Sequence, residues 1–283
     1  MADKRSPYQL PSATPPEKEI KALKEELRIA NQKIYALSSR GGKYVIDPNG
    51  ASSLKLGVTS DWHVGSLYCN ERAIIDFHEY AYSQGVRHFV NAGDVIEGES
   101  NYKGQIYEIK QAGLTRQVAA LEEIACKLPQ GAEYIFITGN HCGGYHKEVG
   151  IDIGDYIEMK IPMLKYIGRD KGMIEISTPS GDVRVQLIHP DGGTAYAVSY
   201  KVQKIVEGLA GGDKPHLLVV GHYHKAELLP RIRNVAALQA GTFQEQTPFM
   251  ARKGAEAHVG GWIVEFEMGE LYNRIKTEFV SFF

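Results

Sequence analysis

The sequence HLLVVGHYH, from His216 to His224, contains a continuous apolar run, a glycine and two histidines separated by one residue. A run of leucine and valine is typical of a β-strand that is buried on both faces. Gly221 ends the run, so His222 and His224 are expected at the carboxyl end of that strand. In an extended backbone, residues two apart point to the same side, and both imidazoles should then face one site. Such a pair is typical of a metal site, but it also arises by chance.

Four other strand-like runs also end in residues that can bind a metal. A single Asp or His at the end of a strand is usually a cap or a turn residue. Parallel strands, however, deliver their carboxyl ends to one edge of a sheet, where ligands bind in α/β folds. Five such ends therefore predict one shared site. The additional residues are Asp61, His63, Asp94, Asn140, His141 and His189.

Strand-like and helix-like segments alternate from Leu54 onward. We expect strands over 54–60, 86–92, 133–139, 183–189 and 216–221, with two more in the C-terminal segment 234–268. Helices are expected over 71–85, most of 102–128, and 194–209. This alternation predicts an α/β layered fold.

The first 53 residues differ from the remainder in composition. Ser6 to Pro16 is rich in proline and serine and is expected to be extended or disordered. The sequence TPPE at 14–17 predicts a helix start, and apolar residues then recur at alternate steps of three and four from Ile20 to Leu37. This short heptad stripe indicates either self-association or partner binding, or a helix packed on its own domain. We therefore divide the chain into 1–53, with a tail, a helix and a linker, and a catalytic domain over 54–283.

Composition limits the class of protein. The chain has 283 residues, of which 43% are hydrophobic and 23% charged, as in ordinary globular proteins. Its formal net charge of −2 gives no general attraction to nucleic acid or anionic membranes. The three cysteines have no CxxC spacing, and we find neither a signal peptide nor a membrane span. We expect a cytoplasmic protein without disulfides.

The types of ligand at the strand ends indicate which metals would bind. Imidazole, carboxylate and amide groups without a thiolate suit manganese, iron or zinc. One carboxylate can bridge two ions about 3.5–4 Å apart, the spacing of two-metal phosphoryl-transfer sites.

The motifs DWH, GDVIE, GNH, a later single His and GHYH closely resemble, in this order, those of the calcineurin-like metallophosphoesterases. The resemblance extends from about Leu54 to Phe266. It implies a four-layer α/β/β/α sandwich with two divalent metal ions, of which manganese is favoured over iron or zinc. It further implies that His141 is the general acid for the leaving oxygen and that Asp94 bridges the two metals. The remaining ligands would be Asp61, His63 and His224 for one metal, and Asn140, His189 and His222 for the other.

Two features depart from the pattern of that superfamily. The residue after GNH is often acidic in the family, where it supports the histidine, but here it is Cys142. A neutral thiol cannot stabilise a charged imidazole as a carboxylate does, so another carboxylate such as Glu148 or Asp152 is expected to support His141. The arginines that grip a phosphomonoester in the protein phosphatases of this superfamily are missing from GDVIEGES and GNHCGGYHK. This argues against a protein phosphatase.

Two segments near the expected site combine aromatic and basic residues. Tyr196, Tyr200 and Lys204 fall on one face of the helix predicted after His189, and this face is either a substrate strip or an ordinary solvated one. Arg252 and Lys253 lie in a predicted loop that should return to the edge of the sheet where the expected site lies. Both segments resemble metallophosphoesterases of phages and prophages that are often described as exonucleases.

Three functional hypotheses follow. The first is a metal-dependent phosphodiesterase, a nuclease that acts on DNA or RNA. The second is a hydrolase of a small phosphate ester, a cyclic nucleotide or a nucleotide monoester, which fits the lack of excess basic charge. The third is a non-catalytic scaffold that binds a partner or a second copy through its N-terminal helix.

Overall fold

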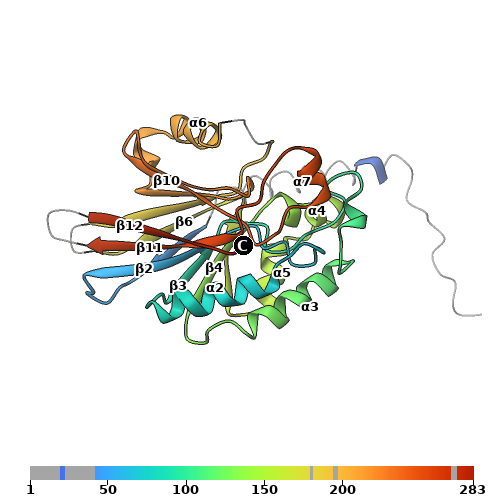
Figure 1. The fold of residues 1–283 in the computed structure, drawn as a ribbon, viewed down its shortest axis with the longest axis horizontal. Helices are drawn as coiled ribbons and strands as arrows, with labels where there is room; N and C mark the ends of the chain where they lie inside the picture. The colour runs from blue at the N-terminus through green and yellow to red at the C-terminus, as the bar shows by residue number, and fades with distance from the viewer. Residues whose placement is uncertain (1–19, 23–41, 179–180, 194–196, 269–272) are drawn as a thin grey trace, which may run out of the picture. The chain divides into compact units, whose positions relative to one another are not determined.

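The computed structural model describes residues 20–22, 42–178, 181–193, 197–268 and 273–283. In the segment 42–283, twelve strands form two six-stranded sheets (Figure 1). Sheet I has the strand order β12-β11-β2-β3-β4-β5, and its last four strands are parallel. Its strands are β2 (Ser53–Thr59), β3 (His88–Asn91), β4 (Glu133–Thr138), β5 (Leu164–Arg169), β11 (Gly260–Met268) and β12 (Asn273–Ser281).

Sheet II has the order β1-β6-β7-β8-β10-β9 and mixes parallel and antiparallel pairs. Strands β7, β8 and β10 are parallel neighbours in it, so the chain leaves β7 and β8 at the same edge. Its strands are β1 (Lys43–Ile46), β6 (Lys171–Ile176), β7 (Val183–Ile188), β8 (Leu217–Val220), β9 (Ala226–Ile232) and β10 (Val235–Ala240).

The two sheets pack face to face and each has helices on its outer side, as Figure 1 shows. Helices α2 (Glu71–Ser83), α3 (Leu114–Ala125) and α5 (Ile153–Lys160) cover sheet I, and α6 (Tyr200–Gly208) covers sheet II. The predicted four-layer α/β/β/α sandwich is therefore confirmed. The remaining helical segments are η1 (Gln105–Tyr107), α4 (Asn140–Val149), η2 (Gly211–Asp213) and α7 (Pro248–Arg252).

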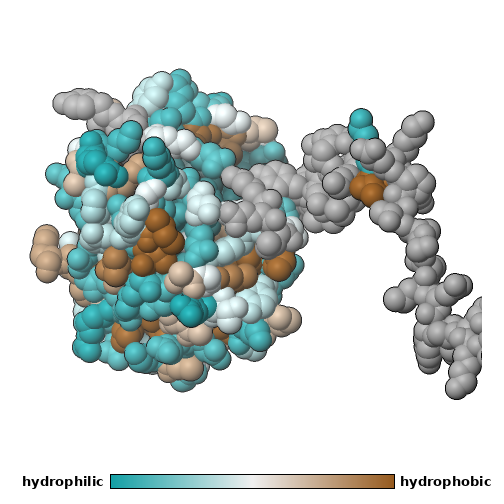
Figure 2. Space-filling view, turned by 90° about the vertical axis from the view of Figure 1, so that its right-hand side faces the viewer, coloured by the Kyte–Doolittle hydropathy of each residue, from teal (hydrophilic) through white to brown (hydrophobic). Residues whose placement is uncertain are grey.

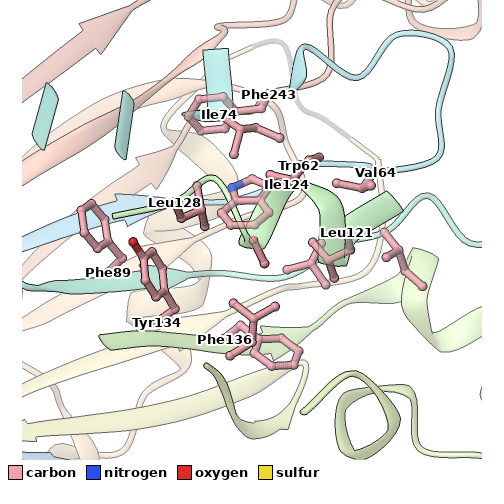
Figure 3. Packing of buried hydrophobic residues seen from close by; sticks show 14 of the residues in the cluster. Trp62, Val64, Ile74, Phe89, Leu121, Ile124, Leu128, Tyr134, Phe136 and Phe243 are labelled. Atoms are coloured by element: carbon pink, nitrogen blue, oxygen red, sulfur yellow. The ribbon is translucent and has the colours of Figure 1, made fainter. Parts of the chain in front are cut away.

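Alternation along β4 divides the core between two layers. Tyr134 and Phe136 pack against the helices of sheet I, where Figure 3 shows them with Phe89 and Leu121. The intervening Ile135 belongs to the cluster between the sheets. Because side chains alternate along a strand between two buried layers, β4 is apolar from Tyr134 to Ile137, and β8, which is buried throughout, is apolar at every position.

Several predicted elements differ from the observed ones. The strand β1 lies inside the segment assigned to tail, helix and linker, because Lys43–Ile46 pairs with β6. The helix expected over most of 102–128 is helical only in η1 and α3, with Gly104 and Gly113 in the left-handed region at their starts. Of the helix expected at 194–209, the described part begins at Tyr200. The heptad stripe lies outside the described residues except for Ile20–Ala22, which is helical. The division at residue 53 stays a prediction.

The surface on the side of α4 and α7 is mostly hydrophilic, with hydrophobic patches between polar regions (Figure 2). No helix in the described part of the chain has the length and apolar character needed to cross a bilayer.

Candidate metal centre

The carboxyl ends of five strands meet at one place. The chain leaves β2, β3, β4, β7 and β8 there, so residues that are far apart in the sequence become neighbours. The side chains form compact groups in each of which the possible ligand atoms lie within 4.8 Å of one another, and a third such group, His63, Glu97 and His141, overlaps the first of the two described next. The first group consists of Asp61, His63 and His224, and the second of Asp94, His189 and His222, with Asn140 beside it.

In the first group, lone pairs converge on one point. The Nδ1–H of His63 donates to Glu97 Oε2 at 2.8 Å, so in the neutral ring the lone pair is on His63 Nε2. That nitrogen lies 3.1 Å from His224 Nε2 and 3.6 Å from Asp61 Oδ1, and His224 Nε2 lies 3.2 Å from the same carboxylate oxygen. Three atoms that can coordinate a cation therefore face each other.

The second group repeats this arrangement. His189 Nδ1 donates to the carbonyl of Ala92 at 2.8 Å, and His222 Nε2 donates to that of Gly192 at 2.6 Å. The other nitrogen of each ring faces Asn140 Oδ1, at 3.0 Å from His189 Nε2 and 2.9 Å from His222 Nδ1. Asp94 Oδ2 lies 2.9 Å from His189 Nε2. Asp94 thus belongs to the second group here, and its bridging role stays a prediction.

The pKa values of one histidine in each group, His63 and His189, reflect the negative charge of the nearby carboxylates. Burial alone would lower the pKa of His63, but the neighbouring carboxylates of Asp61 and Glu97 raise it to about 10. Burial likewise opposes the charge on His189, yet Asp94 and Asp61 raise its pKa to about 9. Although burial raises the pKa values of Asp61 and Asp94, the neighbouring histidines hold both below the ordinary range. The carboxylates stabilise a positive charge here, and a metal would displace the protons that otherwise supply it.

The residues present fit a divalent metal. Asp61 Oδ1 and Asp94 Oδ2 are buried, and neither accepts a hydrogen bond from any residue that the structure describes. A buried carboxylate oxygen without a donor is unfavourable unless a cation satisfies it. Nitrogen and oxygen ligands without a thiolate are those of manganese, iron and zinc sites.

Five of these residues have left-handed backbone conformations. The φ angles are 52° at Asp61, 49° at His63, 50° at Asp94, 76° at His222 and 54° at His224. Each costs about 1–2 kcal/mol for a residue other than glycine, and such strain concentrates at functional sites. The expectation that His222 and His224 extend to the same side is therefore wrong, and their division between two metals, which the resemblance implies, stays a prediction. Their rings diverge, His224 to the first group and His222 to the second.

The glycines of the motifs have a steric role. A Cβ atom at Gly93 would clash with the His189 ring, and one at Gly139 would clash with both Asp94 and His189. At Gly221 it would meet Ser60 Oγ and the carbonyl of Ala92. Because it has no side chain, each glycine allows the end of its own strand to lie close to side chains that follow the neighbouring strands.

His141 stands beside both groups at the start of α4. Its backbone N–H donates to Asp94 Oδ1 at 2.9 Å, and its Nδ1–H donates to the carbonyl of Glu97 at 2.7 Å. Its side chain is 15% exposed, so Nε2 remains available to a substrate. The ring packs edge-on against that of His63, with centroids 4.5 Å apart. This geometry suits a proton donor next to the candidate metal centre.

Glu97 gives the support that Cys142 cannot. Its Oε1 lies 3.7 Å from His141 Nδ1, and the carboxylate also accepts from His63, Gln105 and Gln244. Burial and the charge of Asp94 raise the pKa of Cys142 to about 12, so its thiol is neutral and packs in the core. The predicted supporter Asp152 instead caps α5 by accepting from Gly154, while the side chain of Glu148 lies outside the described residues. In the sequence, the position of Glu97 three residues after Asp94 in the motif GDVIE was the feature that could have identified this residue.

The residues predicted to bind substrate do not form one group beside the candidate metal centre. Tyr196 lies outside the described residues, so the stripe that it would share cannot be followed to the site. Tyr200 is 50% exposed at the start of α6, and Lys204 pairs with Glu207 at 2.7 Å. Within the described part of the chain, no hydrogen bond or ring contact joins these two residues to the metal centre. Arg252 and Lys253 are exposed at the end of α7.

No protein-family model and no curated protein sequence matches this chain. Similar solved structures include Vps29 of Entamoeba histolytica complexed with zinc, which is 12% identical with a TM-score of 0.40. The match covers 81% of this chain and 99% of that one. A predicted phosphoesterase of Streptococcus pneumoniae is 13% identical with a TM-score of 0.40, covering 81% and 100%. GAP50 of Plasmodium, the anchor in the inner membrane complex, is 14% identical with a TM-score of 0.47, covering 82% and 85%. What this chain binds is therefore inferred from its own side chains.

Proposed function

We propose that this chain is a metal-dependent phosphoesterase that hydrolyses phosphodiester bonds of nucleic acid through a dinuclear centre. The observation that carries this proposal is the pair of adjacent buried groups in which imidazole and carboxylate lone pairs converge. Asp61, His63 and His224 would hold one ion, and Asn140, His189 and His222 the other, with Asp94 between them. Bound divalent ions supply Lewis-acid stabilisation of the phosphate and activation of water.

The protein's own residues supply orientation and a proton. Because His141 Nδ1–H is held by the Glu97 carbonyl, its Nε2 is the atom that donates to the leaving oxygen. Glu97 fixes His63 through its carboxylate and His141 through its carbonyl, so one residue aligns a metal ligand and the acid. This arrangement requires no covalent intermediate on the protein.

Diesters are favoured over monoesters because arginine is missing from the segments that follow Asp94 and His141. From Val95 to Gly104 and from Cys142 to Gly150 the sequence contains only lysine as a cationic residue, at Lys103 and Lys147. A phosphomonoester dianion is usually gripped by guanidinium groups, which form bidentate bonds with phosphate oxygens. A diester carries one charge and needs less compensation.

The direct test combines metal binding with a panel of substrates. Protein stripped with a chelator is titrated with manganese by calorimetry, and we expect two ions per chain. Hydrolysis is then compared for bis(p-nitrophenyl) phosphate, p-nitrophenyl phosphate, a cyclic nucleotide, and single- and double-stranded oligonucleotides. We expect the diester and an oligonucleotide to be cut in manganese and not in chelator. Failure to bind any divalent metal would refute the proposal, and turnover of a cyclic nucleotide without oligonucleotide cleavage would restrict it to small esters.

A further inference from the structure

Two aromatic rings stack beside His141. The rings of Tyr102 and Phe249 are nearly parallel, with centroids 4.6 Å apart and an interplanar angle of 28°. The Tyr102 ring lies 6.1 Å from that of His141. Tyr102 comes from the segment after β3 and Phe249 from α7, and both side chains are only partly buried. The pair therefore presents aromatic surface next to the proposed proton donor.

A buried carboxylate holds this pair in place. Glu108 is 5% exposed, and its Oε2 accepts the Tyr102 hydroxyl at 2.7 Å. Its Oε1 accepts the backbone N–H of Phe249 at 3.2 Å. Thr247 caps α7 by accepting from Met250, whose side chain is buried. The two rings are thus fixed by specific hydrogen bonds before any substrate arrives, which reduces the ordering required on binding.

Cationic groups flank the stacked rings. Lys253 Nζ lies 5.9 Å from the centre of the Phe249 ring, and Arg252 precedes it in the last turn of α7. Both side chains are exposed. Within the segments that the structure describes, neither forms an ion pair with a carboxylate. They are therefore available to phosphate oxygens.

We infer that Tyr102 and Phe249 form a platform that stacks the nucleobase on the leaving-group side of the scissile phosphate. The assignment to that side follows from the position of the rings next to His141, because the leaving oxygen lies where the acid is. A nucleobase is favoured over an aliphatic group because partly exposed rings with adjacent cations match a base and its phosphates. Every base has a π-face, so the platform tolerates all four bases. This inference rests on the proposed function and deepens it.

The test removes one partner of the stack at a time. Single-stranded oligonucleotides carry an abasic tetrahydrofuran residue at successive positions, and cleavage of each linkage is measured for wild type and Phe249→Leu. In wild type, loss of the base on the leaving side should slow cleavage by about tenfold or more, the usual effect of one stacked base. Phe249→Leu should cut the intact oligonucleotide about as slowly as wild type cuts the abasic one. It should not distinguish the two substrates, because the partner of the base is already gone.

Controls separate stacking from structural damage. Tyr102→Phe keeps the ring and loses only the bond to Glu108, so it should retain most of the base dependence. Tyr80→Leu, an exposed aromatic residue on α2, should behave as wild type. A second readout needs no turnover: anisotropy of a labelled oligonucleotide in chelator should show about tenfold weaker binding for Phe249→Leu and for the abasic strand.

The outcomes keep this inference distinct from the proposed function. If wild type hydrolyses bis(p-nitrophenyl) phosphate but cuts abasic and intact linkages equally, the platform is refuted and the phosphoesterase stands. If wild type distinguishes the strands in the binding assay but hydrolyses nothing, base stacking on this pair stands, while the phosphoesterase is refuted together with the assignment to a leaving-group side. A base dependence that Phe249→Leu leaves unchanged also overturns the assignment.

Discussion

At the scale of single residues, both carboxylate oxygens of Asp94 face groups of the candidate metal centre. Its Oδ1 accepts the backbone N–H of His141, and its Oδ2 faces His189. We expect Asp94→Asn to lose both bound metal and roughly two decades of activity or more, since an amide gives up the negative charge and one acceptor oxygen. Metal content by mass spectrometry and the rate on bis(p-nitrophenyl) phosphate measure the two effects.

The control is Asp76→Asn, in which a carboxylate on α2 pairs with Arg72 away from the rim. That variant should retain metal and rate. Full metal content in Asp94→Asn would show that the residue is not a ligand.

His141 is expected to act on the leaving group and not on metal binding. His141→Ala should keep its metal and lose about two to four decades of rate on a diester with an alkoxide leaving group. The loss should be much smaller for a nitrophenolate, which departs without a proton. Rates on both substrates are compared with those of Cys142→Ala, the adjacent buried thiol, which should be unaffected. Equal losses on both substrates would count against a proton-donor role.

At the scale of elements, the N-terminal segment is predicted to mediate assembly. The stripe from Ile20 to Leu37 remains a sequence-based expectation, but the structure shows where a truncation has to stop. The backbone N–H of Gly42 donates to the carbonyl of Ile167, and β1 follows at Lys43, so a deletion through residue 50 would remove a strand of sheet II.

Deleting residues 1–40 should therefore lower the mass of an oligomer without altering hydrolysis of a small diester. Light scattering and the chromogenic rate are the two measurements. A chain that is monomeric both before and after truncation would refute assembly through this segment.

At the scale of the whole molecule, a buried histidine makes stability depend on pH. His78 on α2 is enclosed by aromatic rings, with Trp62 at 5.3 Å and Phe89 at 4.7 Å, and burial lowers its pKa to about 4. In the unfolded chain its pKa returns to 6.5. Between these values the unfolded state binds a proton that the folded state does not, so this residue reduces stability as pH falls from about 6.5 towards 4.

Replacing His78 should remove that part of the pH dependence. Between pH 7 and pH 5 the histidine accounts for a loss of ~2 kcal/mol in the free energy of unfolding. Urea unfolding of metal-free protein should show this loss in wild type and not in His78→Leu. His63 and His189 are present in both proteins, so their contributions to the pH dependence cancel when the unfolding free energies of wild type and His78→Leu are subtracted. Identical pH dependence in the two proteins would mean that His78 is accessible to protons in the folded state.

The residues that meet at this edge of the sheets could be predicted from the sequence because each motif is local. In the segments that end at Asp94, Asn140 and His222, a buried strand is followed by glycine and a candidate ligand. This pattern places the side chain at the carboxyl end of the strand, and parallel strands have their carboxyl ends at the same edge of the sheet. The α/β layering could be predicted for the same reason, since periodicity is a property of neighbouring residues. Strands such as β1 and β5 were not predicted, because basic and apolar residues are mixed along them and form no continuous apolar run.

The sequence by itself determined which residues reach this edge of the sheets, and its resemblance predicted two sets of them, while only the tertiary structure decided the backbone and the contacts that bring each set together. Left-handed backbone at His222 and His224 turns their rings to different groups, and no rule of alternation predicts that conformation outside glycine. Glu97 could replace the missing acidic neighbour only because the chain folds its carboxylate and carbonyl against two histidines. The stacked pair of Tyr102 and Phe249 exists because a loop after β3 and a helix before β11 meet at one carboxylate. Such contacts depend on the packing of distant segments, which local sequence does not specify.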